Sequence, residues 1–241
     1  IPIITSSTDS NGSTVSDLTL SYTVTFSKPV SDFAVGDITV TGTANGGSPA
    51  ASNFAGSGAT YTFDVVRGSS DGTVVVSVAA GTATDVSSNS NIASNTCTFT
   101  VDTVHPIPII TSSTDSNGST VSDLILSYTV TFSKHVSDFA VGDITVTGSA
   151  NGGSPAASNF AGSGATYTFD VVKGSSDGTV VVSVAAGTAT DAAGNDNTVS
   201  NTYILTIDTV NPTITISSTT SCGSTVDDTT LNYTVTFSES V

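Results

Sequence analysis

The sequence predicts an all-β protein made of tandem sandwich domains arranged as an extended rod, and three observations carry that prediction. Residues 1–106 recur as residues 107–212 with about 15 substitutions in 106 aligned positions. Threonine, serine, asparagine, aspartate, glycine and valine dominate, whereas tryptophan and methionine are absent and glutamate occurs once. Apolar residues alternate with hydroxyl residues in short runs, which is the period of a half-buried strand and not of a helix.

The repeat sets the predicted domain organisation: repeat 1 at 1–106, repeat 2 at 107–212, and the incomplete start of a third repeat at 213–241. A period near 106 residues is too long for a solenoid unit and matches a domain that folds around its own core. The chain begins with Ile1 and stops inside a strand-like run, so we expect it to be a window on a longer polypeptide.

Strands can be assigned in order along repeat 1. The first lies near Ile3–Ser6, and in the second Leu18 to Phe26 alternate with threonine and serine, giving one apolar face. A short strand is expected near Phe54. The other predicted strands are Ile38–Thr43, Thr60–Val66, Thr73–Val78 and Asn95–Val101.

Turn residues separate these runs, at Asp9–Gly12, Gly46–Pro49 and Asp71–Gly72. About seven short strands in roughly 100 residues indicate a Greek-key sandwich of two sheets, which is immunoglobulin-like. The tryptophan and inter-sheet disulfide usual in such domains are missing, so packing alone must hold the sandwich. The expected large core residues are Tyr22, Phe26, Phe54, Tyr61 and Phe63.

The third repeat offers only the first two strands, Ile214–Ser217 and Leu231–Ser238. Two strands cannot bury both of their faces. Either the remaining strands lie in sequence beyond this window, or a neighbouring chain supplies them by strand addition.

Charge excludes two classes of partner. The net charge is −16, and the chain has only four basic residues, Lys28, Arg67, Lys134 and Lys173. Nucleic acid and anionic membrane surfaces need clustered lysine and arginine, so neither is expected as a partner. No stretch approaches the roughly 20 apolar residues of a membrane helix, so no membrane insertion is expected in this segment.

The residues of catalysis are not assembled in any recognisable pattern, so we do not expect an enzyme. The two histidines, His105 and His135, have no matching partners, and nothing distinguishes one serine as a nucleophile. Gly56–Gly58 and Gly162–Gly164 precede strands, so they are expected to be tight turns and not phosphate loops.

Several strings occur in order along the repeats: VTFSKPVSDFAVGDITVTG, TYTFDVV and DGTVVVSVAAGTATD in repeat 1 and, in repeat 2, TDAAGNDNTVSNTYILTIDTVNP. Over nearly the whole chain this pattern resembles the bacterial immunoglobulin-like (Big) tandem repeats of large extracellular adhesins and surface proteins. The resemblance implies an extracellular, cell-surface module that stacks end to end, often with calcium stiffening the joints.

The residues at the joints permit a test of that implication. In a seven-strand sandwich, the end of one domain meets the turn before the last strand of the next, so Asp102 would approach the turn at 190–197. Several oxygen ligands at such a joint suit Ca²⁺, although aspartates also make turns and cap strand ends. The predicted calcium ligands are Asp102, Asp138, Asp191, Asn195, Asp196 and Asp208. Repeat 1 reads TDVSSNSN where repeat 2 reads TDAAGNDN, so its corresponding site is weaker.

Three asparagines match the N-glycosylation pattern: Asn11, Asn117 and Asn232. Such matches arise by chance in a sequence rich in serine and threonine, and modification depends on a host that glycosylates.

Together these features predict a structural extracellular array, the spacer or stalk of a cell-surface adhesin or similar protein, whose partners are neighbouring repeats of the same chain. The alternative is a subunit of a self-assembling extracellular filament, in which identical chains join through incomplete immunoglobulin-like domains. A third possibility is a multivalent module that binds glycans or surfaces.

Overall fold

The computed structural model describes residues 1–44, 50–150, 156–174, 176–227 and 229–240. Strands dominate these residues, and the helical elements among them are short 3₁₀ turns such as η1 (Val35–Asp37) and η3 (Val141–Asp143). The predicted all-β class is confirmed. None of the helices in the described ranges is long and apolar enough to cross a membrane. The turn predicted at Gly46–Pro49 lies outside the described residues.

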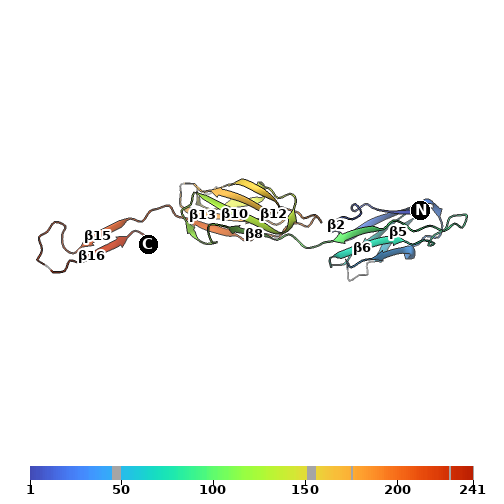
Figure 1. Cartoon of the computed structure of the whole chain (residues 1–241), viewed down its shortest axis with the longest axis horizontal. Coiled ribbons are helices and arrows are strands. Elements are labelled where there is room, and N and C mark those ends of the chain that lie inside the picture. The colour runs from blue at the N-terminus through green and yellow to red at the C-terminus, as the bar shows by residue number, and fades with distance from the viewer. Residues whose placement is uncertain (45–49, 151–155, 175, 228, 241) are drawn as a thin grey trace.

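Two similar sandwich units and a terminal hairpin follow one another along the chain, as Figure 1 shows. We call them unit 1 (β1–β7), unit 2 (β8–β14) and the hairpin (β15–β16). The strands of unit 1 are β1 Pro2–Ser6, β2 Thr14–Val15, β3 Thr19–Val30, β4 Ile38–Thr41, β5 Ala50–Val66, β6 Gly72–Val78 and β7 Cys97–Val101. Those of unit 2 are β8 Pro108–Ser112, β9 Thr120–Val121, β10 Ile125–Val136, β11 Ile144–Thr147, β12 Ala157–Val172, β13 Gly178–Val184 and β14 Tyr203–Ile207.

Each unit has two sheets with the same topology. Unit 1 pairs β1-β3-β5 in one sheet and β2-β7-β6-β4 in the other, and unit 2 repeats this as β8-β10-β12 and β9-β14-β13-β11. The pairs are antiparallel except that the two-residue strands β2 and β9 run parallel to β7 and β14. This arrangement confirms the immunoglobulin-like sandwich, although the sequence did not indicate so short a strand as β2.

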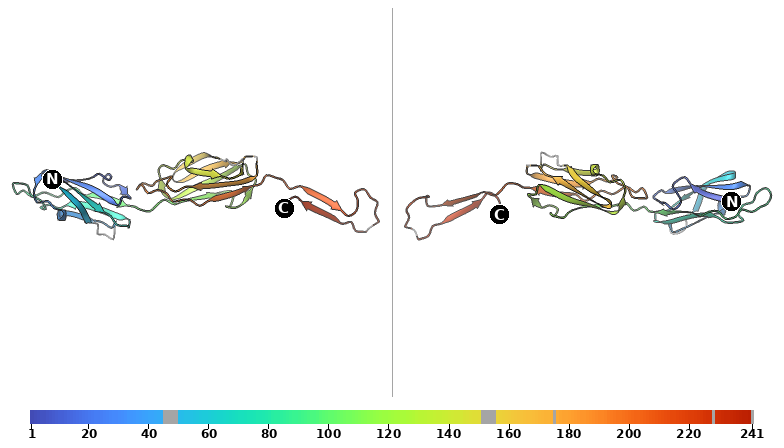
Figure 2. Two further views of the ribbon diagram at one scale, coloured as in Figure 1. Left: turned by 180° about the vertical axis from the view of Figure 1, so that it is seen from behind. Right: turned by 45° about the horizontal axis from the view of Figure 1, so that its top comes forward.

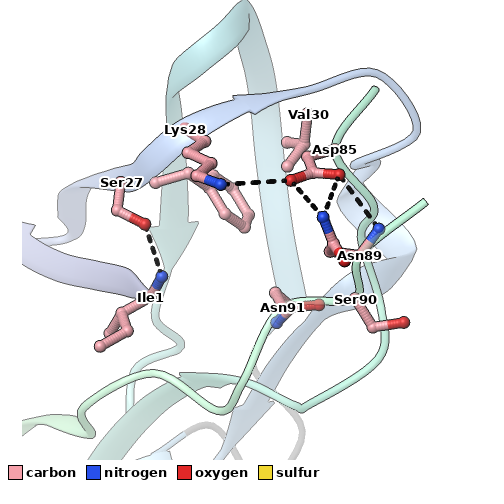
Figure 3. Close-up of a pocket in the computed structure, with 9 residues that line it drawn as sticks. Ile1, Ser27, Lys28, Val30, Asp85, Asn89, Ser90 and Asn91 are labelled. Atoms are coloured by element: carbon pink, nitrogen blue, oxygen red, sulfur yellow. Dashed lines mark hydrogen bonds and ion pairs between the residues drawn. The ribbon is translucent and has the colours of Figure 1, made fainter. Parts of the chain in front are cut away.

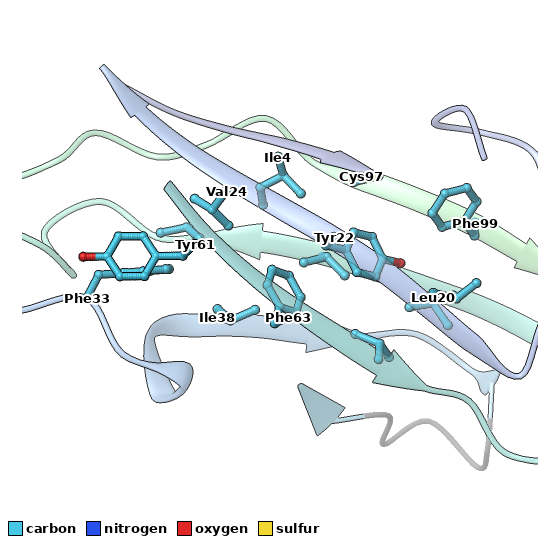
Figure 4. Close-up of a cluster of buried hydrophobic side chains, with 14 of the residues drawn as sticks. Ile4, Leu20, Tyr22, Val24, Phe33, Ile38, Tyr61, Phe63, Cys97 and Phe99 are labelled. Atoms are coloured by element: carbon cyan, nitrogen blue, oxygen red, sulfur yellow. The ribbon is translucent and has the colours of Figure 1, made fainter. Parts of the chain in front are cut away.

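The core lies between the two sheets, and the alternation in β3 explains it. Leu20, Tyr22, Val24 and Phe26 are buried while the residues between them face outward. Tyr22 stacks on Phe63 with ring centroids 5.1 Å apart, and both side chains are labelled in Figure 4. Four of the five predicted large core residues are buried; Phe54, the fifth, is partly buried and packs against them.

Strand β5 contains a reversal that two predicted strands and a glycine turn had indicated. Its first half folds back beside its second half. Two contacts join the halves: Ser52 Oγ donates to the carbonyl of Asp64, and the ring of Phe54 stacks on that of Tyr61. Gly56 and Gly58 have φ of 121° and 67°, which suits a chain reversal. A Cβ at Gly56 would lie 2.4 Å from the carbonyl oxygen of Thr60, so a side chain cannot be placed there.

The hairpin pairs β15 (Ile214–Ser218) with β16 (Tyr233–Phe237) in the register that β8 and β10 use in unit 2. Its apolar residues are uncovered: Ile216 is 65% exposed and Tyr233 is 63% exposed. The matching residues of unit 2, Ile110 and Tyr128, are 1% and 2% exposed. The hairpin is therefore two strands of a sandwich without the sheet that covers them.

Unit 1, unit 2 and the hairpin lie in line along the longest axis of the molecule. The further views of Figure 2 show the same order, with the N-terminus in the outermost unit and the hairpin at the opposite end. The joint between units 1 and 2 is therefore the element that sets the direction of the array.

Candidate functional site

The chain leaves unit 1 through a short stretch, residues 102–106, which we call the exit segment. Its first residue continues the pairing of β7, since Asp102 N donates to the carbonyl of Val15 at 3.0 Å. Thr103 donates from both its N and its Oγ1 to Asp71 Oδ1, at 2.8 and 2.7 Å. Val104 N donates to Asp102 Oδ1 at 3.0 Å. The exit segment is therefore fixed to unit 1 before it reaches unit 2.

Unit 2 meets this segment with the turn at residues 190–197, which we call the joint loop. Asp191 organises it, because its Oδ1 accepts hydrogen bonds from the backbone N of Ala193 and of Asn195, both at 2.9 Å. Gly194 has φ of 81°, a conformation that favours glycine. The side chain of Asp191 is 3% exposed, so its carboxylate is a buried charge that needs a partner.

Lys134, near the end of β10, supplies that partner and joins the two units. Its ammonium Nζ donates to Asp191 Oδ2 at 2.6 Å, to Asp102 Oδ2 at 2.5 Å and to the carbonyl of Val104 at 2.7 Å. An ammonium group has three protons, and here each has an acceptor. Two of the three acceptors belong to the exit segment and one to the joint loop. The three residues Lys134, Asp102 and Asp191 form what we call the lysine lock.

Further hydrogen bonds between the exit segment and unit 2 surround the lock. Asn195 Nδ2 donates to the carbonyl of Asp102 at 2.9 Å, and Thr198 N donates to the carbonyl of Pro106 at 2.9 Å. His105 Nδ1 lies 2.6 Å from the carbonyl oxygen of Asp196. The joint is therefore held at several points, which restricts bending about the exit segment.

Hydrogen bonds within the lock favour the charged forms of Asp191 and Lys134. Burial alone would raise the pKa of Asp191, but hydrogen bonds from Lys134 and Asn195 outweigh it and hold that pKa below its usual range. Burial alone would lower the pKa of Lys134, but its hydrogen bonds to Asp102 and Asp191 raise that pKa above its usual range. Lys134 is 24% exposed at its side chain, so the pair is partly shielded from water.

The structure brings three of the predicted calcium ligands together, namely Asp102, Asp191 and Asn195. Asp196 takes part in the joint through its backbone carbonyl, which contacts His105, and the residue is otherwise exposed. The described residues contain no group of three or more histidine, cysteine, aspartate or glutamate side chains placed to hold a metal. At this joint the residues do not fit Ca²⁺, because the ammonium of Lys134 lies between the two carboxylates.

The other two predicted ligands lie elsewhere. Asp138 does not join the lock; its carboxylate accepts from Thr190 N at 2.7 Å and Thr190 Oγ1 at 2.9 Å, within unit 2. Asp208 begins the exit from unit 2, where its Oδ1 accepts from Val210 N at 3.1 Å, as Asp102 does in unit 1. Calcium at this second exit stays a prediction.

The predicted glycosylation residues have defined places. Asn11 and Asn117 each brace a neighbouring strand: Asn11 Oδ1 accepts from Thr98 N at 2.7 Å, and Asn117 Oδ1 accepts from Ile204 N at 2.8 Å. Both residues are exposed, and Asn232 lies exposed beside the hairpin strand β16. Glycosylation stays a prediction. The side-chain amides of Asn11 and Asn117 also hold the neighbouring strand in place.

Lys134 was missed by sequence reasoning. One signal pointed to it: the chain has few basic residues, and a lysine stands at the same place in both repeats, as Lys28 and Lys134, although the next residue changes from Pro29 to His135. The same holds for Arg67 and Lys173, and Arg67 donates to backbone carbonyls, so a shared cation alone does not single out Lys134.

Fold and joint together define a string of immunoglobulin-like sandwiches linked by a built-in ion pair. Residues 102–207, which run from the exit of unit 1 to the last strand of unit 2, match the family model described as a bacterial Ig-like domain. Unit 1 repeats the fold and most of the sequence of unit 2. This is a family of non-catalytic modules typical of surface proteins. No curated protein matches the chain.

Proposed function

We propose that the chain is a stalk segment of an extracellular surface protein, in which locked immunoglobulin-like units hold a more distant part away from the cell. The observation that carries the proposal is the lysine lock. A spacer must resist bending at its joints, and the lock fixes the exit of one unit to a loop of the next through a partly shielded charge network. The net charge of −16 also disfavours association between neighbouring stalks.

The interaction energy at the joint supports a stiff connection. Charge-assisted hydrogen bonds contribute about 1.5–3 kcal/mol each where they are shielded from water, and three of them converge on Lys134. Two of these hydrogen bonds have their acceptors in the exit segment, Asp102 Oδ2 and the carbonyl of Val104. Both bonds must therefore break or rearrange when unit 2 tilts away from unit 1. Random Gly/Ser-type linkers lack such contacts and behave as flexible coils.

Small-angle X-ray scattering of the full chain tests this proposal. We expect a maximum dimension that matches units 1 and 2 in line, and a shorter average dimension with a broader distribution for Lys134→Gln. Lys28→Gln is the matched control, because Lys28 occupies the same place in unit 1 but contacts no exit segment in this chain. A wild-type chain as compact or as flexible as Lys134→Gln would contradict the stalk proposal.

A second candidate function rests on the hairpin. Its residues Ile216 and Tyr233 are uncovered, whereas their counterparts in unit 2 are buried in the core. Strands from an identical chain could cover them, which would make the protein a filament subunit.

Sedimentation velocity over a wide range of concentration separates the two candidates. Filament assembly predicts species that grow with concentration and disappear when Tyr233 and Val235 are both changed to serine. A chain that stays monomeric at high concentration would contradict assembly through the hairpin and leave the stalk proposal intact.

A further inference from the structure

At the end that faces away from unit 2, unit 1 carries the counterparts of three joint residues of unit 2. Lys28, Asp85 and Asn89 stand where unit 2 has Lys134, Asp191 and Asn195. They lie on the matching elements, β3 and the turn at 84–91, and line one pocket with a volume of about 180 Å³, shown in Figure 3. We call this pocket the socket.

The acidic half of the socket is already organised. Asp85 Oδ1 accepts from Ser87 N at 2.9 Å and from Asn89 N at 3.0 Å, which repeats the bonds that Asp191 makes in the joint loop. Asn89 Nδ2 also donates to both oxygens of Asp85, at 3.1 and 3.0 Å. The loop therefore has the joint geometry without any exit segment beside it.

The basic half of the socket is Lys28, which stands at the right position but has fewer acceptors than Lys134. Lys28 Nζ lies 3.7 Å from Asp85 Oδ2, whereas Lys134 Nζ lies 2.6 Å from Asp191 Oδ2. The side chain of Lys28 is 70% exposed, against 24% for Lys134. What distinguishes the two sites is the exit segment, which gives Lys134 two further acceptors, Asp102 Oδ2 and the carbonyl of Val104.

The path of the backbone into the socket is also the same. Ile1 N donates to Ser27 Oγ at 2.8 Å, as Ile107 N donates to Ser133 Oγ at 2.9 Å. A residue joined to Ile1 would therefore start from the position and direction that Pro106 has in front of Ile107.

We propose that the socket is a docking site for the exit segment of another immunoglobulin-like unit joined at Ile1, whose aspartate would contact Lys28 as Asp102 contacts Lys134. The two exits of this chain define the chemistry of the partner: an Asp-Thr-Val segment whose aspartate accepts from the valine N, present at Asp102 and again at Asp208. A carboxylate and a carbonyl would complete the hydrogen bonds of the Lys28 ammonium, and Asn89 is the counterpart of Asn195, whose Nδ2 donates to the carbonyl of Asp102. The proposal rests on the stalk function above and names the surface through which the stalk would extend.

An extended protein tests it: the full chain with a copy of residues 1–106 fused directly before Ile1. The readout is the set of lysine side-chain ammonium signals in ¹⁵N NMR spectra, which are seen when Nζ is hydrogen-bonded and shielded from exchange with water. The original chain has only Lys28, Lys134 and Lys173, so the assignment is simple. In the original chain we expect a signal from Lys134 and none from Lys28.

In the extended protein a signal from Lys28 of the original unit 1 should appear, and it should vanish when the aspartate corresponding to Asp102 in the added copy is changed to alanine. If Lys28 stays unprotected while Lys134 is protected, the docking proposal is overturned and the stalk proposal survives. If Lys134 itself is unprotected, the lysine lock and the stalk proposal fail together. Protection of Lys28 in the original chain that grows with concentration would overturn the proposed occupant in favour of a second copy.

Discussion

Units 1 and 2 carry the same lysine, aspartate and asparagine at corresponding ends, but only in unit 2 do these residues contact a neighbouring unit. Ten of the 15 substitutions between the repeats lie at residues 86–101 of unit 1, in and after the loop that carries Asp85. The polar residues of the lock are unchanged while much around them differs. The contacts of Lys134 with Asp102 and Val104 therefore form only where two units meet, whereas the aspartate loop is folded in the same way in each unit.

The largest expected difference between the units lies in the core, at Cys97 and its counterpart Tyr203. Tyr203 packs edge-on against Tyr128 at 5.6 Å and donates its hydroxyl to the carbonyl of Asp115. Cys97 fills less space, and a pocket of about 260 Å³ lies beside it. Tyr203→Cys should destabilise unit 2 by about 3 kcal/mol, because it removes a buried ring and leaves a cavity.

The reverse change, Cys97→Tyr, is the matched control and should stabilise unit 1 by about 1 kcal/mol by filling that pocket. Denaturant unfolding followed by NMR signals of each unit separates the two effects. Equal loss of stability in both units after Tyr203→Cys would contradict independent cores.

A smaller but more specific effect is expected at the buried carboxylate. Asp191→Ala removes one of the three acceptors of Lys134 and the acceptor of two backbone N–H groups of the joint loop, so it should cost unit 2 about 2 kcal/mol. It should also free the joint. Asp85→Ala in unit 1 should alter its own loop without changing the angle between the units. Chemical denaturation measures the loss of stability, and small-angle scattering measures the change at the joint. Equal scattering curves for both variants would contradict the role of Asp191 in holding the joint.

The joint should depend on pH at both ends of the scale. The pKa of Asp191 is lowered on folding, so its contribution is present above the unfolded value of about 3.9 and is lost as pH falls through the lower folded value. The pKa of Lys134 is raised, so its contribution is present below about 10.4 and is lost as pH rises through the higher folded value.

We therefore expect the shielded ammonium signal of Lys134 and the chemical shift of the Asn195 side-chain amide to be constant from about pH 4 to pH 10. The alkaline change should be confined to the joint, since Lys28 has no such set of acceptors. An amide shift that changes steadily between pH 5 and 9 would contradict this assignment.

The smallest effect concerns the loop backbone. Ser88 has φ of 60°, where its counterpart Gly194 has φ of 81°. A left-handed conformation costs a residue with a Cβ about 1 kcal/mol, part of which glycine loses again as chain entropy. Ser88→Gly should thus stabilise unit 1 by about 0.5 kcal/mol, and Gly194→Ser should destabilise unit 2 by a similar amount, both measured by thermal unfolding. Opposite signs would show that neighbouring residues control the loop.

Much of the fold followed from the sequence because strands with one buried face carry a period of two. The alternation from Leu18 to Phe26 predicts β3 and its core residues, and the repeat predicts that unit 2 is built alike. Strand β2, Thr14–Val15, has only two residues and therefore no period to detect.

The site was only half predictable. The topology of a seven-strand sandwich predicts that Asp102 approaches Asp191, Asn195 and Asp196, and the structure brings these side chains together except for that of Asp196. The cation between them was expected to be Ca²⁺, whereas the structure has Lys134 there. Local sequence could not show this, because Lys134 lies on β10, 57 residues from Asp191 and 32 from Asp102, and meets them only after folding.

The most direct test of the lysine lock is the measurement of residual dipolar couplings for units 1 and 2 in the full chain, in the wild type and in Lys134→Gln. The account predicts that both units of the wild type share one alignment tensor and that Lys134→Gln gives two different tensors, while Lys28→Gln keeps one. Two independent tensors in the wild type, or one shared tensor in Lys134→Gln, would contradict the claim that this lysine holds the units in line.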